Sequence, residues 1–379
     1  MNIKSLLLLT LSSLFIGDSY AQLSDSATIS ILTVRQGDSV DNAFGHTAVW
    51  VVDPISKKSE IYNFGIFDFD EPGFLMKFLR GKLLYSLGIN GKKSFFNNYT
   101  AQKRTILEQK LNLNAKQRND IYLSLRENYK KENRKYLYDF FFDNCSTRPR
   151  DLLYNNLPEL SEANSETPTK TFRDLIDENV FARPWMDFGI DLIIGKKADK
   201  IASIQDQMYL PEYFYKKLNN LSNGGEPLVS SAEIILDYEQ EAEARKHVPW
   251  LTPALIFGIL LLLEVILFIA YRKRSDTTFV KLYDKMWYII IGISSLVILF
   301  MWFGTDHIAT GDNLNVFWLN PLFLITIVSR SRILKILLAF FMVTALVVGV
   351  TVQQFHIASI LIICLLLVKL ARQLQVSKT

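Results

Sequence analysis

The chain has 379 residues, of which 49% are hydrophobic and 21% charged, and its mean hydropathy is +0.14. A soluble protein of this length would carry more charge, so the composition predicts that part of the chain lies in a membrane. The net charge of +4 comes from the second half, because residues 250–379 hold 11 Lys/Arg against 5 Asp/Glu. A near-neutral first half argues against a nucleic-acid partner. Two cysteines exclude a disulfide framework and a Cys-rich metal site, and no cofactor is expected.

The N-terminus has the pattern of a secretory signal. Lys4 precedes an apolar run over residues 6–16, and Ser19 and Ala21 place small side chains at the −3 and −1 positions of a cleavage site. The apolar run is too short to cross roughly 30 Å of hydrocarbon, which disfavours the alternative of an uncleaved anchor. We therefore expect residues 1–21 to be a signal peptide and the rest of the chain to be exported.

The second half, residues 250–379, is predicted to be a transmembrane domain of five helices. Clusters of Lys and Arg fall on alternate loops between the apolar runs, and the positive-inside rule places these loops in the cytoplasm. We therefore expect a multi-pass protein of the inner (cytoplasmic) membrane, with its N-terminal domain in the periplasm and its C-terminus in the cytoplasm. The predicted spans are residues 251–271, 287–303, 316–328, 336–352 and 357–368.

Two polar residues of the predicted bundle have two interpretations each. Glu264 lies near the middle of the first span, where a carboxylate is costly and faces the bundle interior or water. It is either held by a neighbouring helix or part of a functional site. His307 lies among polar residues in the exported loop between the second and third spans. It is a candidate for catalysis, although a loop at a membrane surface is polar in any case.

The exported part, residues 22–237, is predicted to form one α+β domain, followed by a charged linker over residues 238–249. The segment 74–87 has apolar residues at helical spacing with basic residues between them. It either packs on the core or rests on anionic headgroups. The predicted elements are strands over residues 28–34, 45–52 and 60–67, of which the last two form a hairpin, and helices over 74–87 and 114–131.

Cys145 is the first candidate for chemistry. Cys364 lies inside the fifth predicted span, so Cys145 is an unpaired thiol in an oxidising compartment. A lone cysteine is usually a small buried apolar residue. Here, however, Asn144 is placed to cap a helix that starts at Cys145, and Arg148 and Arg150 lie one turn further on. A positive helix end and nearby cations lower the pKa of a thiol, so we expect a reactive thiolate.

His46 is the candidate base, because the other exported His lies in the predicted linker. A neutral imidazole takes the proton of a thiol when a third group holds the ring in place. Asn63, across the predicted hairpin, is the first choice for this group, with Asp68 and Asp53 as alternatives. One His and one Cys145 thiol are too few ligands for a structural zinc site.

Three segments carry a resemblance to a known family. They are GDSVDNAFGHTAVW around His46, YNFGIFDF around Asn63 and YLYDFFFDNCSTRPRD around Cys145. They resemble the N-terminal periplasmic domain of the Lnb-type lipoprotein N-acyltransferases of Bacteroidetes, and the similar architecture covers nearly the whole mature chain. The wider arrangement looks like a permuted papain-like fold of the NlpC type, in which a strand His serves a Cys at a helix start. That group often has a second His, which this domain lacks, so the orienting residue stays open.

The resemblance implies a lipoprotein N-acyltransferase. Such an enzyme moves an acyl chain from a phospholipid, through a Cys145 thioester, to the N-terminal amine of a diacylglyceryl-Cys lipoprotein, with the membrane bilayer as a further partner. We expect Arg148 and Arg150 to bind a lipid phosphate, because a guanidinium matches a phosphate bidentately. The alternative is that they are solvated surface charges or pair with Asp151. The alternatives are a membrane-anchored Cys hydrolase, acting on peptidoglycan peptides or phospholipids, and a non-enzymatic membrane sensor. Further candidate substrate contacts are Asn144, Asp68, His307 and Glu264.

Overall fold

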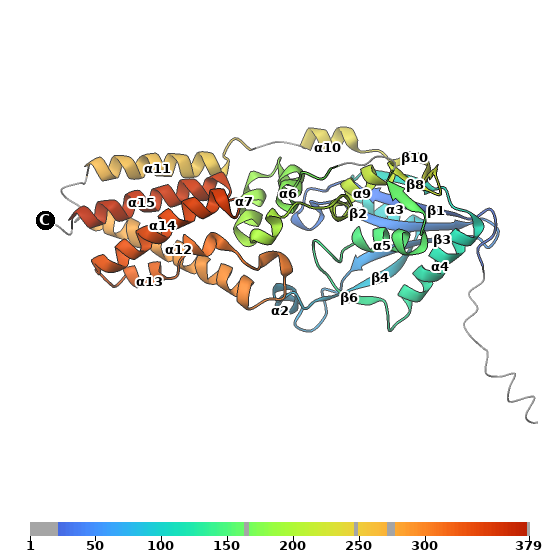
Figure 1. Ribbon diagram of the computed structural model, residues 1–379, viewed down its shortest axis with the longest axis horizontal. Coiled ribbons are helices and arrows are strands. Elements are labelled where there is room, and N and C mark those ends of the chain that lie inside the picture. The colour runs from blue at the N-terminus through green and yellow to red at the C-terminus, as the bar shows by residue number, and fades with distance from the viewer. Residues whose placement is uncertain (1–21, 163–166, 246–248, 271–276, 377–379) are drawn as a thin grey trace, which may run out of the picture.

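The computed structural model describes residues 22–162, 167–245, 249–270 and 277–376. The predicted signal peptide lies outside the described residues. The described chain forms an α+β domain and a bundle of helices, which follow one another along the long axis of the molecule (Figure 1). The predicted fold class is therefore confirmed.

A seven-stranded antiparallel sheet forms the centre of the N-terminal domain, with strand order β10-β5-β1-β2-β3-β4-β6. A smaller sheet has the order β7-β8-β9. The strands are β1 (Thr28–Val34), β2 (His46–Asp53), β3 (Lys58–Ile66), β4 (Leu84–Gly91), β5 (Ile106–Leu111), β6 (Lys135–Leu137), β7 (Leu160–Glu162), β8 (Leu221–Asn223), β9 (Glu226–Pro227) and β10 (Val229–Leu236).

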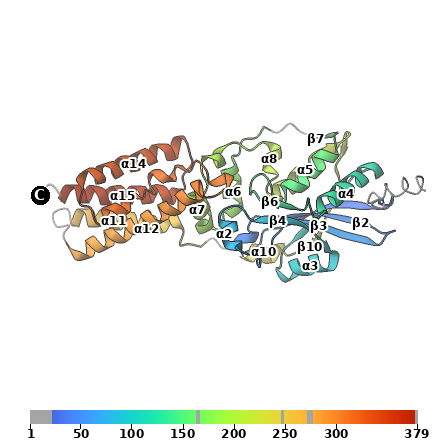
Figure 2. The same cartoon turned by 90° about the horizontal axis from the view of Figure 1, so that it is seen from below.

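Helices cover both faces of the large sheet, because its inner strands carry apolar residues on both sides. One face buries Trp50 in a core with α3 (Lys92–Ala101). The other buries Tyr62 in a core with α4 (Ala115–Tyr129) and α5 (Thr147–Asn156). Figure 2 shows these helices on opposite sides of the strands. The domain therefore has three layers, and α5 packs against β2 and β3 of the large sheet.

The sequence predicted most of these elements. Strand 28–34 is β1, the hairpin is β2 paired with β3, and helix 114–131 is α4 within two residues at each end. The helix over 74–87 is wrong beyond its first half, since α2 (Phe74–Leu79) ends early and β4 follows it. Gly81 lies between them at φ +68°, a left-handed conformation that commonly follows the last turn of a helix.

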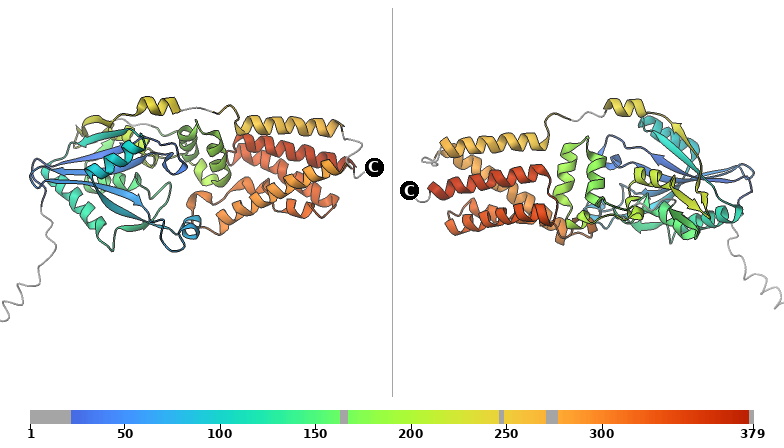
Figure 3. Two further views of the ribbon diagram at one scale, coloured as in Figure 1. Left: turned by 180° about the vertical axis from the view of Figure 1, so that it is seen from behind. Right: turned by 45° about the horizontal axis from the view of Figure 1, so that its top comes forward.

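A group of short helices connects the sheet with the bundle (Figure 3). Phe188 of this group packs on Phe257 of the bundle, with ring centres 5.6 Å apart. The charged segment predicted as a linker, residues 238–249, contains one helix and the undescribed residues 246–248. The helices of this region are α6 (Phe172–Val180), α7 (Pro184–Ile193), α8 (Ile204–Gln207), α9 (Pro211–Leu218) and α10 (Glu239–Arg245).

Five helices form the bundle, and among the described residues four of them are long and apolar enough to cross a membrane. The exception corresponds to the third predicted span, 316–328. Asn320 and Pro321 interrupt that run, and the Asn320 side chain accepts the Leu322 N–H at 3.0 Å, so only a short helix follows. The bundle helices are α11 (Pro253–Ala270), α12 (Thr278–Phe303), α13 (Leu322–Thr326), α14 (Arg332–Thr351) and α15 (Ile357–Val376).

Candidate active site

His46 and Asn63 meet at one end of the hairpin. His46 opens β2, and its Nε2 lies 2.6 Å from the side-chain oxygen of Asn63 on β3. Asn63 Nδ2 in turn donates to Asn90 Oδ1 at 3.2 Å, which turns the Asn63 oxygen toward the ring. Because an amide oxygen only accepts, Nε2 carries the hydrogen and Nδ1 keeps its lone pair. The structure thus brings together the predicted base and the first-choice orienting residue.

Asn144 shapes the turn that carries Cys145. Its side-chain oxygen accepts the N–H groups of Ser146 and Thr147 at 2.7 and 2.9 Å, as at a helix N-terminus. Its amide nitrogen donates to two backbone carbonyls at 2.7 and 3.0 Å. The predicted capping is confirmed, although α5 begins at Thr147 rather than at Cys145. The Asn144 amide has all its partners inside the protein, and its contact with substrate stays a prediction.

Cys145 lies beside the strand that begins with His46. The backbone N–H of Thr47, the next residue after His46, hydrogen bonds to the Cys145 sulfur. On β3, Gly65 takes the left-handed φ of +92°, and a Cβ there would lie 3.8 Å from the Cys145 Cβ. The thiol therefore lies against β2 and β3, at the end of the hairpin that holds His46 and Asn63.

Burial sets the protonation of the two groups. It raises the pKa of the Cys145 thiol to about 11, and the backbone N–H groups of Thr47 and Cys145 only partly oppose this effect. Burial also lowers the pKa of His46 to about 4, against the opposing hydrogen bond from Asn63. Near neutral pH the pair is a neutral thiol and a neutral imidazole. The expected resting thiolate is therefore wrong, because desolvation outweighs the helix end.

The two arginines expected to favour the thiolate are engaged elsewhere. Arg148 donates from Nε and Nη2 to Asp143 at 2.5 and 2.8 Å. Arg150 donates to Asp151 at 2.7 Å and to the Gln205 carbonyl at 3.0 Å. Neither contributes to the pKa of the thiol, and both already have oxygen partners. Pairing with Asp151, the alternative to phosphate binding, is confirmed for Arg150, whereas Arg148 pairs with Asp143 instead.

Arg104 is the cation that acts on the site, and sequence reasoning missed it. It is buried, and its charge lowers the pKa of both Cys145 and His46. Two of its nitrogens donate to the Arg35 carbonyl and the Gln102 side chain, at 2.8 and 3.2 Å. The third, Nη2, is buried without a hydrogen-bond partner in the described part of the chain. A buried guanidinium with an unused donor favours negative charge nearby.

The two carboxylates proposed as alternatives to Asn63 have other roles. Asp53 lies at the far end of β2 from His46, where it accepts hydrogen bonds from Ser24. Asp68 is exposed, and its side chain accepts the Asp70 N–H at 2.9 Å. Asp53 as the orienting residue is therefore wrong, since a side chain seven residues along a strand is roughly 20 Å away. The His46 ring hydrogen bonds to Asn63 rather than to Asp68, whose contact with substrate stays a prediction.

The two candidates from the membrane half lie away from the thiol. His307 Nε2 lies 3.1 Å from the carbonyl oxygen of Phe78, so it joins the bundle to α2. Glu264 is buried in the bundle and pairs with Lys369 at 2.8 Å and Arg372 at 3.1 Å. Of the two interpretations of Glu264, the structure supports the one in which a neighbouring helix holds it.

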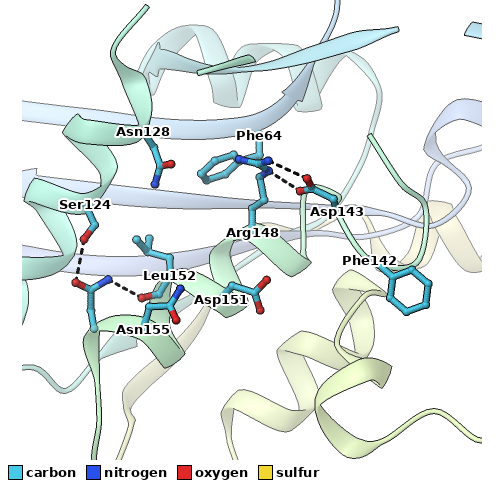
Figure 4. A pocket seen from close by; sticks show the side chains of 10 residues that line it. Phe64, Ser124, Asn128, Phe142, Asp143, Arg148, Asp151, Leu152 and Asn155 are labelled. Atoms are coloured by element: carbon cyan, nitrogen blue, oxygen red, sulfur yellow. Dashed lines mark hydrogen bonds and ion pairs between the residues drawn. The ribbon is translucent and has the colours of Figure 1, made fainter. Parts of the chain in front are cut away.

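A pocket of about 430 Å³ opens between α4 and α5 (Figure 4). The paired side chains of Arg148 and Asp143 form part of its wall, with Phe64 next to the guanidinium. Cys145 and His46 are not among the described residues that line it. This pocket is therefore separate from the thiol.

Comparison with known proteins identifies the family. The Lnb N-terminal periplasmic domain matches residues 20–178, and the Lnb transmembrane domain matches residues 243–379. No curated protein and no solved structure gives a match. The first match contains His46, Asn63 and Cys145, and the second contains all five helices of the bundle. The chain therefore belongs to the Lnb family, as a membrane protein with a periplasmic N-terminal domain and a multi-pass transmembrane domain.

Proposed function

We propose that this protein is a lipoprotein N-acyltransferase in which Cys145 is the nucleophile and His46 the base. The observation that carries the proposal is the Asn63–His46 hydrogen bond beside a thiol at a helix start. This bond leaves Nδ1 of the ring as a proton acceptor. The same chain continues into membrane-spanning helices, as a reaction between two lipid-bearing substrates requires.

The first step forms an acyl-enzyme. The Cys145 sulfur attacks the carbonyl carbon of a phospholipid ester, while the thiol proton passes to His46 Nδ1. The bond between that carbon and the glycerol oxygen then breaks, and the imidazolium returns the proton to the leaving oxygen. A Cys145 thioester and a lysophospholipid result. Since the resting pair is neutral, the proton moves during the attack, as general-base catalysis.

The second step transfers the acyl chain. The unprotonated α-amine of the diacylglyceryl-Cys N-terminus attacks the thioester carbonyl, and one of its protons passes to His46 Nδ1. The carbon–sulfur bond breaks, and the departing thiolate takes the proton back. An amide and the free Cys145 thiol result. A thioester reacts with amines far more readily than an oxygen ester does, so dividing the reaction in two lowers the barrier.

Arg104 and the backbone assist the charges that develop. The Thr47 and Cys145 N–H groups lie at the sulfur, where they stabilise the thiolate that forms and departs. The positive charge of Arg104 acts in the same direction.

The proposal includes a location and an orientation. We place the protein in the inner membrane with its C-terminus in the cytoplasm, because Arg330, Arg332 and Lys335 form a basic loop between spans. Lys369 and Arg372, which follow the fifth predicted span, do not add to this argument, since both are buried within α15.

Transfer with purified protein tests the proposal. Full-length protein in phospholipid nanodiscs is incubated with a synthetic diacylated lipopeptide, and the mass of the lipopeptide is measured. We expect a gain of one acyl chain with wild type and with Cys364→Ala. We expect no gain with Cys145→Ala or His46→Ala, and a slower gain with Asn63→Ala.

Other outcomes contradict the proposal. A gain with all variants refutes the roles of Cys145 and His46. Release of free fatty acid without a mass gain on the lipopeptide indicates the Cys hydrolase, if this activity survives removal of the residues after Pro249. An intact donor and an unchanged lipopeptide indicate the non-enzymatic sensor.

A further inference from the structure

We propose that the segment joining β3 to β4, residues 67–83, rests on the bilayer and leads a phospholipid acyl chain from it to Cys145. We call residues 67–83, which include α2, the surface segment. The inference rests on the proposed function, because it names the route of the acyl donor. Four observations support it, from the exposed end of the segment to the thiol.

The surface segment exposes apolar side chains. None of the six residues of α2 is buried. Leu75, Met76 and Phe78 are 66%, 57% and 47% exposed, and Phe69 before the helix is 72% exposed. The exposed cation Arg80 follows directly. The segment also carries Asp68, Asp70 and Glu71 before the helix, so its charges balance. Exposed apolar side chains beside a cation are typical of a segment that lies in the headgroup region.

The bundle fixes the position of α2. The Arg80 carbonyl accepts the Asp306 N–H at 2.9 Å, and the Phe78 carbonyl lies 3.1 Å from His307 Nε2. Both partners come shortly after Phe303, the last residue of α12. Figure 1 shows α2 next to this end of the bundle. The segment is therefore anchored where the spans leave the membrane.

Tryptophans mark the same end of the spans. Trp250 is 74% exposed and precedes α11, which starts at Pro253. Trp302 stacks on Phe303 at the end of α12, with ring centres 4.7 Å apart. Tryptophan is enriched at the level of the lipid headgroups. This level is the one at which α2 is anchored, so its exposed side chains lie at the height of the headgroups.

A continuous row of aromatic rings leads away from α2. The ring centres of Phe78 and Phe74 are 6.2 Å apart, and those of Phe74 and Phe67 are 5.9 Å apart. The row continues from Phe67 to Tyr85 at 5.2 Å and from Tyr85 to Tyr138 at 4.5 Å. The faces of such rings offer a flexible acyl chain an apolar surface.

The inner end of the row lies beside the nucleophile. Tyr85 on β4 pairs with Tyr136 on β6. The Tyr136 hydroxyl and the Cys145 Cβ lie at the same glycine, since a Cβ on Gly65 would be 4.0 Å from the first and 3.8 Å from the second. The row therefore connects the membrane-level patch of α2 with the thiol.

Site-directed spin labelling tests the membrane contact. A nitroxide is placed by Met76→Cys or, as control, Ile55→Cys, in full-length protein that carries Cys145→Ser and Cys364→Ala. Ile55 is also apolar and 75% exposed, but lies in the turn at the far end of the β2–β3 hairpin. Oxygen is enriched in lipid, whereas a nickel chelate stays in water. In nanodiscs we therefore expect oxygen to relax the nitroxide at position 76 more strongly than the nickel chelate does, and the nickel chelate to relax the nitroxide at position 55 more strongly than oxygen does. The same aqueous pattern at both positions overturns the inference.

Acylation of Cys145 from two donors tests the route. Wild type, Met76→Glu and the control Ile55→Glu receive either nanodisc phospholipid or water-soluble p-nitrophenyl butyrate, and acylated Cys145 is measured by mass spectrometry. We expect Met76→Glu to lower the ratio of phospholipid to soluble-ester rates by about tenfold, and Ile55→Glu to leave it unchanged. The soluble ester also reports whether each variant is folded. An unchanged ratio in Met76→Glu overturns the route, whereas wild type that accepts neither donor overturns the proposed function.

Discussion

At the level of single residues, Cys145 and His46 are both neutral near neutral pH. Desolvation holds the pKa of Cys145 near 11 and that of His46 near 4, and Asn63 fixes the tautomer of the ring. A neutral thiol resists oxidation better than a thiolate does, which suits an unpaired cysteine in an oxidising compartment. Arg104 lowers the pKa of both groups, because its positive charge favours the Cys145 thiolate and disfavours the His46 imidazolium.

The rate at which iodoacetamide alkylates Cys145 measures how much of the thiol is ionised at each pH. We expect the rate in wild type to rise about tenfold per pH unit between pH 7 and 10, because the thiolate is the reacting form and the pKa lies above this range. Removing a cation raises the pKa of a thiol, so Arg104→Gln should react more slowly at every pH. Arg104→Lys keeps the charge and should react at nearly the wild-type rate. A plateau below pH 8, or faster alkylation of Arg104→Gln, contradicts the neutral pair.

At the scale of elements, the start of β2 depends on a residue without a side chain. Gly45, just before His46, has φ +83°, and a Cβ there would lie 2.8 Å from the Val34 carbonyl oxygen. We expect Gly45→Ala to lower the free energy of unfolding by roughly 2 kcal/mol, from left-handed strain and this contact. The control is Gly189→Ala in helix α7, where a Cβ meets open space. Denaturant titration of both variants measures the difference, and equal midpoints would contradict this reading of Gly45.

Elements that are encoded by residues close together in the sequence were predicted correctly, whereas contacts between distant segments were not. Strand alternation and the helical spacing of Ile121 and Leu125 are encoded within a few residues, and β1 to β3 and α4 were predicted from these patterns. Asn63 was predicted because a hairpin brings it next to His46, which is close to it in the sequence. Arg104 was not, because its approach to Cys145 depends on how distant strands and α5 pack.

The helix prediction over 74–87 failed for a different reason. Residues 74–87 have helical spacing, but Gly81 ends the helix, and pairing with β3 and β6 makes the second half a strand. Tertiary pairing overrode the local pattern there. The third predicted span, 316–328, contains the short helix α13, which follows Asn320 and Pro321.

At the scale of the whole molecule, the bundle is joined by buried charges. Glu264 on α11 and Asp284 on α12 both pair with Lys369 and Arg372 on α15, at 2.7–3.1 Å. Two negative and two positive charges balance within this cluster. Its role is therefore to hold three helices together, and the loss of one member leaves an excess charge in the bundle.

Substitution within this cluster tests the role. We expect Glu264→Gln to destabilise the protein in detergent by about 3–5 kcal/mol, because Lys369 and Arg372 then share one carboxylate. Lys369→Gln should do the same, whereas the double variant should be more stable than the sum predicts, since the charges balance again. Thermal denaturation of the three variants provides the comparison. Additive losses would show that the two residues act independently.

The two domains together position the site, because the bundle holds the surface segment at the end of the spans and the sheet holds the Cys145 thiol. We propose that the acyl chain passes through a thioester on Cys145, and trapping this intermediate is a direct test. Wild-type protein in phospholipid nanodiscs, without acceptor, is digested and analysed by mass spectrometry. We predict one acyl chain, labile to hydroxylamine, on the peptide that contains Cys145, and none in Cys145→Ala. An acyl chain on another peptide, or continued transfer to lipopeptide by Cys145→Ala, would contradict the account.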